Sequence, residues 1–118
     1  MPVGNGLLAV YRAIPPFGLA LPGGFVEHDE SWQEAAVREL NEELQVRVSP
    51  DEIQEYRTIS SSNGILLVFG LAPAMEFSQL PDFVPNDEVS GRNIIVSDKK
   101  IVFPIHAQVI REYFGSRP

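Results

Sequence analysis

The 118-residue chain contains no cysteine, only two histidines and one tryptophan. The absence of cysteine excludes disulfide scaffolds, thiolate metal sites and cysteine nucleophiles. The longest apolar runs, such as residues 65–71, are far shorter than the roughly 20 residues that a membrane-spanning helix needs. No charged-then-apolar leader opens the chain, so we expect a cytoplasmic protein with no membrane partner.

What the chain does contain is enough apolar sequence for one core. Hydrophobic residues make up 44% of it, which excludes a disordered chain, and its 10 prolines and 9 glycines stay below the level of low-complexity sequence. The length suits a single domain covering residues 1–118.

The net charge of -7 is concentrated in one segment. Residues 27–43 carry seven acids and one base, whereas the rest of the chain carries nine acids and eight bases. This balance disfavours a nucleic-acid polymer as partner, because a polyanion would be repelled. The acidic segment is either a solvated helix surface or a site for a cation.

Apolar periodicity and turn signals predict strands, then a helix, more strands and a closing helix. We expect strands at 7–14, 19–22, 55–60, 65–71 and 94–96, helices at 31–44 and 104–114, a hairpin turn at Asn63-Gly64 and a long loop at 79–93. This order predicts a mixed α/β domain with helices packed on a sheet.

A second turn signal, Asn5-Gly6, precedes the first of these strands. Only residues 1–4 lie ahead of it, too few for a full partner strand. Either the turn is incidental or the strand before it is missing. In the latter case we expect a chain shortened at its N-terminus, or a homodimer in which a neighbouring subunit covers the open edge.

The acidic helix places its carboxylates unfavourably. Ser31 and Glu34 form a capping-box pattern at its start. Glu39, Glu42 and Glu43 then share an arc of about 100° beside the apolar stripe. Like charges at these spacings repel, and the helix dipole opposes acids in the second half of the helix. A hard divalent cation, Mg²⁺ or Mn²⁺, would offset both effects.

The spacing of these residues resembles a known motif. Gly24-Phe-Val-Glu-His-Asp-Glu30, seven further residues, and then Arg38-Glu-Leu-Asn-Glu-Glu-Leu-Gln-Val46 is similar to the Nudix box of the Nudix hydrolase (MutT-like) family. The box has a glycine, five residues, Glu, seven residues, and Arg-Glu-aliphatic-x-Glu-Glu-x-Gly-aliphatic. The chain departs from it only at Gln45, which stands at the glycine position.

The resemblance implies a fold and an activity. The fold would be the α/β Nudix fold, a mixed sheet sandwiched between helices, and its first strand would be lacking unless the turn at Asn5-Gly6 is incidental. The activity would be metal-dependent hydrolysis of the pyrophosphate bond in a nucleoside diphosphate linked to another moiety: a nucleotide sugar, an ADP-ribose-like compound or a nucleoside triphosphate. The alternative is a catalytically inactive Nudix-like nucleotide-binding or regulatory module. Such modules usually lose box acids, and all are present here.

The resemblance also implies roles for individual residues. Glu39 and Glu43 would be the principal ligands of Mg²⁺ or Mn²⁺, Glu42 would hold a second cation or a water on the metal, and the Gly23 carbonyl would complete the shell. Glu30 and Arg38 would form the ion pair that fixes the loop to the helix. The general base would be a box glutamate or a distant loop acid, and of Asp87 and Glu88 we choose Glu88.

Substrate contacts and the departure from the box complete the expectations. Phe17 and Phe83 are candidates for stacking on a nucleobase, and Arg12 and Arg57 for contacting phosphate. His28 is expected to be exposed and His106 structural. Gln45 either adopts the left-handed backbone of the glycine that it replaces, at a cost of roughly 1 kcal/mol, or the helix ends differently. In either case we expect reduced stability rather than lost chemistry.

Overall fold

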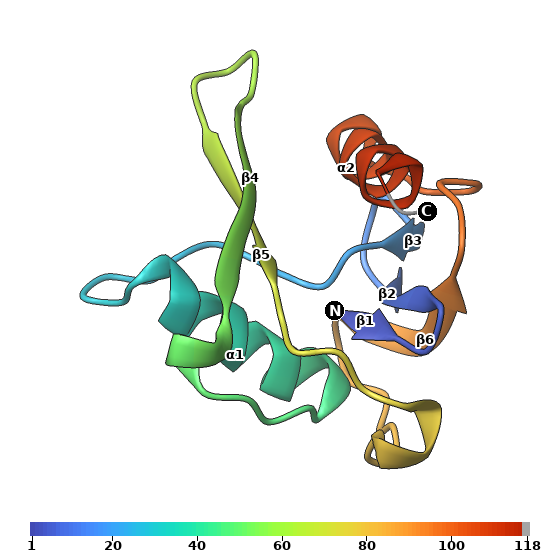
Figure 1. Ribbon diagram of the computed structural model, residues 1–118. Coiled ribbons are helices and arrows are strands. Elements are labelled where there is room, and N and C mark those ends of the chain that lie inside the picture. The colour runs from blue at the N-terminus through green and yellow to red at the C-terminus, as the bar shows by residue number, and fades with distance from the viewer. Residues whose placement is uncertain (117–118) are drawn as a thin grey trace.

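The computed structural model describes residues 1–116 of the chain. Its elements are β1 (Pro2–Val3), β2 (Gly6–Arg12), β3 (Gly18–Ala20), α1 (Trp32–Leu44), η1 (Pro50–Glu52), β4 (Gln54–Ser60), β5 (Leu66–Leu71), η2 (Phe77–Gln79), β6 (Val89–Ile95) and α2 (Pro104–Gly115). The sheet around β2 lies between α1 and α2, and the β4–β5 hairpin projects away beside α1 (Figure 1). This confirms the predicted α/β class.

Strand β2 is the centre of the structure because both of its faces are buried. Leu8 and Val10 belong to the core on the side of α1, whereas Leu7 and Ala9 belong to the core on the side of α2. A strand buried on both faces needs an apolar residue at almost every position. The continuous apolar run in the sequence therefore reflects the sandwich arrangement.

The sheet is built around the two edges of β2. Strand β6 pairs antiparallel along one edge, while β1 and β3 pair antiparallel with opposite ends of the other. Single parallel bridges, Val3 to Met75 and Leu19 to Ile101, make the sheet mixed. Neither helix of residues 1–116 has the length and apolar content that a membrane crossing requires.

The loop predicted at 79–93 is wrong in its last part, because β6 already begins at Val89. Ser90, Gly91, Arg92 and Asn93 show no strand-like alternation, so the sequence carried no local signal. Pairing with β2 decides the conformation instead. At Gly91 a Cβ would come within 3.2 Å of Tyr11 on the neighbouring strand, so a small residue suits this close pairing.

The turn before β2 is a real hairpin turn. It lies at Gly4 and Asn5, one residue earlier than the Asn5-Gly6 signal, with Gly4 at a φ of 57°. The strand ahead of it has only two residues, Pro2 and Val3. The turn is therefore not incidental, and the strand before it is short rather than absent.

The hairpin predicted around Asn63-Gly64 is confirmed, with β4 and β5 paired antiparallel. Its base packs on the start of α1. A Cβ on Gly70 would lie 2.6 Å from Ile53 and 3.0 Å from Trp32, so the glycine allows the close approach. The hairpin thereby supports the first turn of the acidic helix.

Candidate active site

The start of α1 sets the orientation of its acidic residues. Ser31 caps the helix: its Oγ accepts a hydrogen bond from Glu34 N (3.0 Å), and the Glu34 carboxylate accepts one from Ser31 N (2.8 Å). With the start defined, Leu40 and Leu44 are buried in the core. The carboxylates of the second half of the helix then lie along the rim of that apolar face.

Three carboxylates converge at this rim. One oxygen each of Glu39, Glu43 and Glu88 lies within 4.8 Å of the other two. Glu39 and Glu43 are only 8% and 6% exposed, whereas Glu88 is exposed on its loop. Two buried carboxylates beside a third acid are a costly arrangement unless a positive charge balances them.

The pKa values of the two buried acids reflect this cost. Burial raises the pKa of Glu43 to about 7, and the charges of Glu39 and Glu88 add to the rise. The hydrogen bond from Gly23 N to Glu43 Oε1 (2.8 Å) acts against it. Burial likewise raises the pKa of Glu39, opposed by Arg38. The groups that stabilise the negative charges of Glu39 and Glu43 therefore do not offset the effects of burial and of the neighbouring acids.

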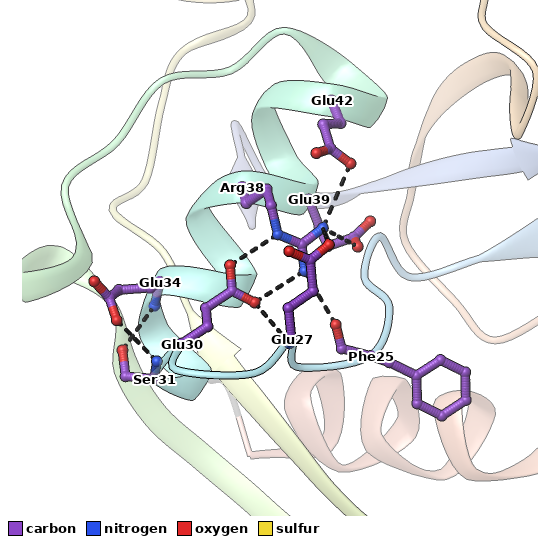
Figure 2. A network of polar contacts seen from close by, with 8 residues as sticks. All are labelled: Phe25, Glu27, Glu30, Ser31, Glu34, Arg38, Glu39 and Glu42. Carbon is purple, nitrogen blue, oxygen red and sulfur yellow. Dashed lines mark hydrogen bonds and ion pairs between the residues drawn. The ribbon is translucent and has the colours of Figure 1, made fainter.

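Arg38 ties the preceding loop to the helix, as Figure 2 shows. Its Nε and Nη2 donate to the two Glu30 oxygens (2.8 and 3.0 Å), and Nη2 also donates to the Phe25 carbonyl (3.0 Å). Its Nη1 donates to Glu39 Oε1 at 2.8 Å. The Arg38 guanidinium holds the pKa of Glu30 below its usual value. Arg38 thus shares its hydrogen bonds between the loop and the helix. Only one of its nitrogens, Nη1, bonds a carboxylate of the cluster.

The two glycines of the loop lie directly against the carboxylates. Gly23 has a φ of 151°, and its N–H bonds Glu43. A Cβ on Gly24 would lie 2.5 Å from Glu39 Oε1, so this position has no room for a side chain. The oxygen donors, their burial and their unbalanced charge fit a hard cation such as Mg²⁺ or Mn²⁺.

Comparison with known proteins identifies the family of the chain. The model of the NUDIX domain matches residues 3–100. The chain belongs to the Nudix family. Family membership makes it a Nudix-type pyrophosphohydrolase, an enzyme that hydrolyses nucleotide pyrophosphate bonds. Comparison with curated protein sequences found no match.

Solved Nudix structures share the fold. A NUDIX hydrolase from Nitrosomonas europaea is 24% identical, with a TM-score of 0.78 over 98% of this chain and 69% of that one. An Ap4A hydrolase from C. elegans is 17% identical, with a TM-score of 0.73 over 93% of this chain and 85% of that one. A MutT/nudix family protein from Enterococcus faecalis is 26% identical, with a TM-score of 0.65 over 75% of this chain but only 36% of that one.

The Nudix-box acids occupy different positions in this site. Glu42 is not among the three clustered carboxylates of the described residues, since its side chain is 56% exposed and lies 3.5 Å from Arg38 Nη1. Glu88, which sequence reasoning selected only as a general base, supplies the third carboxylate. The structure thus brings together two box residues and one loop residue.

The four candidate substrate contacts of the Nudix site have different surroundings. Arg12 donates to the Pro15 and Pro16 carbonyls (3.1 and 2.8 Å), and its charge reaches Glu43, whose pKa it lowers. Arg57 forms two 3.0 Å hydrogen bonds with Glu112 and so joins the hairpin to α2. The remaining two are Phe17, which is 66% exposed, and Phe83, which packs against the core.

His106 is a supporting residue whose partner the sequence did not reveal. Its Nδ1 accepts a hydrogen bond from Leu21 N (3.1 Å), two residues before Gly23. Phe69 and Phe103 flank the ring, and burial, with a smaller contribution from Arg12, lowers the pKa of His106 to about 4. His106 therefore stays neutral at pH 7 and anchors the loop that carries the two glycines. His28, as expected, is exposed.

We expect His106 to make the protein acid-sensitive. Its pKa is lowered from 6.5 to about 4 in the folded chain, so the unfolded chain takes up the proton first as the pH falls. The stability linked to this group is present above pH 6.5 and is lost towards pH 4, by up to about 3 kcal/mol. His106→Gln keeps an acceptor for Leu21 N but does not titrate, so its stability should fall less over this range.

Urea unfolding of both proteins between pH 7 and pH 4 tests this prediction. The difference in unfolding free energy between the variant and the wild type is compared at each pH, so that contributions shared by both, such as that of Glu43, cancel. A constant difference across the range would contradict the assignment.

Proposed function

We propose that the chain uses Mg²⁺ or Mn²⁺ to hydrolyse the pyrophosphate bond of a nucleoside diphosphate linked to another moiety. Candidate substrates are nucleotide sugars, ADP-ribose-like compounds and nucleoside triphosphates. The observation that carries the proposal is the convergence of Glu39, Glu43 and Glu88 within 4.8 Å, with two of the three carboxylates buried. A pyrophosphate could not approach so acidic a site without a cation.

Glu39, Glu43 and Glu88 would hold the cation, with the Gly23 carbonyl as a further ligand from the family resemblance. The chemistry that a bound Mg²⁺ supplies is neutralisation of the pyrophosphate charge and acidification of the attacking water. Glu42, half-exposed on the same helix and 3.5 Å from Arg38 Nη1, would hold a second cation or a water on the metal, as the family resemblance implies.

The protein groups have two further tasks in this proposal. Arg38 holds one oxygen of Glu39 and the Phe25 carbonyl, so that helix and loop keep a common geometry. Glu88 would offer one carboxylate oxygen to the cation, and its other oxygen can accept the proton that the attacking water loses. The water oxygen bonds to one phosphorus, the bridging P–O bond breaks, and the leaving phosphate carries the bridging oxygen away.

A substrate panel tests the proposal. The purified chain is incubated with nucleotide sugars, ADP-ribose, nucleoside triphosphates and dinucleoside polyphosphates at millimolar Mg²⁺ or Mn²⁺. The last class is included because a structural relative is an Ap4A hydrolase. We expect cation-dependent release of a nucleotide product that EDTA abolishes. Absence of turnover with every compound would favour a nucleotide-binding or regulatory module.

Three further parts of the proposal concern the whole molecule. We propose that residues 1–118 form a single domain. We also propose that this domain acts in the cytoplasm on a small nucleotide rather than on a nucleic-acid polymer. Finally, we propose that it forms a homodimer through an open sheet edge. Sedimentation equilibrium tests the homodimer, which predicts twice the mass of the 13.1 kDa chain.

A further inference from the structure

The segment that carries Glu88 is fastened to the C-terminal end of α1 by the side chain of Gln45. Gln45 has a left-handed backbone, with φ 59° and ψ 22°, which is the conformation expected at the glycine position of the box. Its Oε1 accepts a hydrogen bond from Val84 N (2.8 Å), and its Nε2 donates to Val84 O (3.3 Å). A glycine at position 45 could make neither bond.

Asn86 makes a second connection between the same two segments. Its Nδ2 donates to the carbonyls of Glu42 and Glu43 (3.3 and 3.4 Å), which lie in the last turn of α1. Carbonyls at a helix end lack partners within the helix. The Asn86 Oδ1 accepts from Glu88 N and Val89 N (3.1 and 3.0 Å). A single side chain therefore reaches from the backbone of Glu43 to the backbone of Glu88.

These two connections explain how an exposed loop acid comes to lie beside two buried ones. Residues 84–88 are exposed, and ordering such a segment costs conformational entropy. Repulsion from Glu39 and Glu43 also acts against placing Glu88 in the cluster. Ala13 N donates to the Glu88 carbonyl (2.8 Å) and so ties this residue to the sheet. The bonds of Gln45 and Asn86 are what attach the segment to α1.

We propose that Gln45 and Asn86 are positioning residues that together form a clasp, holding the Glu88 loop on α1 so that Glu88 completes the carboxylate cluster. The proposal rests on the cation site proposed above. It assigns a role to the one residue at which the chain departs from the Nudix box. Gln45 is also the residue that caps the C-terminal end of α1, with its N–H bonded to the Asn41 and Leu40 carbonyls. A glycine would cap the helix with less backbone strain, so the bonds to Val84 are what the glutamine side chain adds.

Mn²⁺ binding to the metal-free protein, measured by electron paramagnetic resonance, tests the clasp without relying on activity. Gln45→Met keeps the volume and the left-handed strain but loses both hydrogen bonds, whereas Gln45→Gly relieves the strain and loses them as well. We expect about tenfold weaker Mn²⁺ binding for both variants and for Asn86→Ala. Gln79→Ala is the control, because the Gln79 side chain accepts a hydrogen bond from Glu76 N within its own short turn. This variant should bind Mn²⁺ like the wild type.

A double-mutant cycle with Glu88→Gln distinguishes the clasp from a general effect on the helix. If the clasp acts through Glu88, then Gln45→Met should cause no further loss of Mn²⁺ affinity in the Glu88→Gln background. An equal loss in both backgrounds, or wild-type affinity in both Gln45 variants, would overturn the clasp while leaving the cation site in place. Absence of Mn²⁺ binding by the wild type would overturn both proposals.

Discussion

The Glu43→Gln variant is expected to lose turnover by on the order of 10³-fold, about 4 kcal/mol of barrier, while its metal-free form becomes more stable than the wild type. Glutamine can still accept the hydrogen bond from Gly23 N but cannot serve as an anionic ligand. The loss of activity would then come from a folded protein.

The gain in stability follows from the direction of the pKa shift. The pKa of Glu43 is raised from 4.5 to about 7 in the folded chain. Stability linked to this group is present below pH 4.5 and is lost as the pH rises through 7. At pH 8 the variant should therefore exceed the metal-free wild type by up to about 3 kcal/mol, and the gap should close towards pH 4.5.

Denaturant unfolding with and without Mg²⁺ checks this prediction alongside turnover. The cation should stabilise the wild type and leave the variant unchanged. Glu34→Gln is the matched control, since it makes the same charge change on the same helix and glutamine still completes the capping box. Turnover near the wild-type rate in Glu43→Gln would remove this residue from the proposed site.

Gly24→Ala is expected to lower turnover by about 100-fold with little effect on stability. The added methyl group would lie 2.5 Å from Glu39 Oε1 and 2.8 Å from its Cδ. The carboxylate must then move, which breaks its 2.8 Å bond with Arg38 Nη1 and shifts a proposed ligand. Because the displaced atoms are the end of a side chain, the fold itself should tolerate the change.

Steady-state kinetics and thermal melting of Gly24→Ala test this expectation. Gly115→Ala is its control, because a Cβ there meets no atom within 4 Å. We expect Gly115→Ala to retain wild-type kinetics. If Gly24→Ala did the same, the close contact with Glu39 would have no role in the reaction.

The parts of this molecule that local patterns predicted are those that depend on near neighbours in the chain. The helix start at Ser31 and the hairpin at Asn63-Gly64 followed from turn and cap chemistry within a few residues. The left-handed backbone at Gln45 was one of two helix endings that its place at the glycine position of the Nudix box left open. The strand at Val89–Asn93 was missed because its conformation depends on pairing with β2 rather than on its own side chains.

Helical spacing alone was enough to gather Glu39 and Glu43 on one rim of α1, since a helix has a fixed geometry and its capping residues set where it starts. Only the tertiary structure could decide that Glu88, rather than Glu42, completes the cluster. The contacts that bring it there, made by Gln45 and Asn86, join segments about forty residues apart, and no local periodicity encodes a contact across a loop. Loop closure and side-chain hydrogen bonds set the position of Glu88, and both depend on the packing of elements that are distant in the sequence.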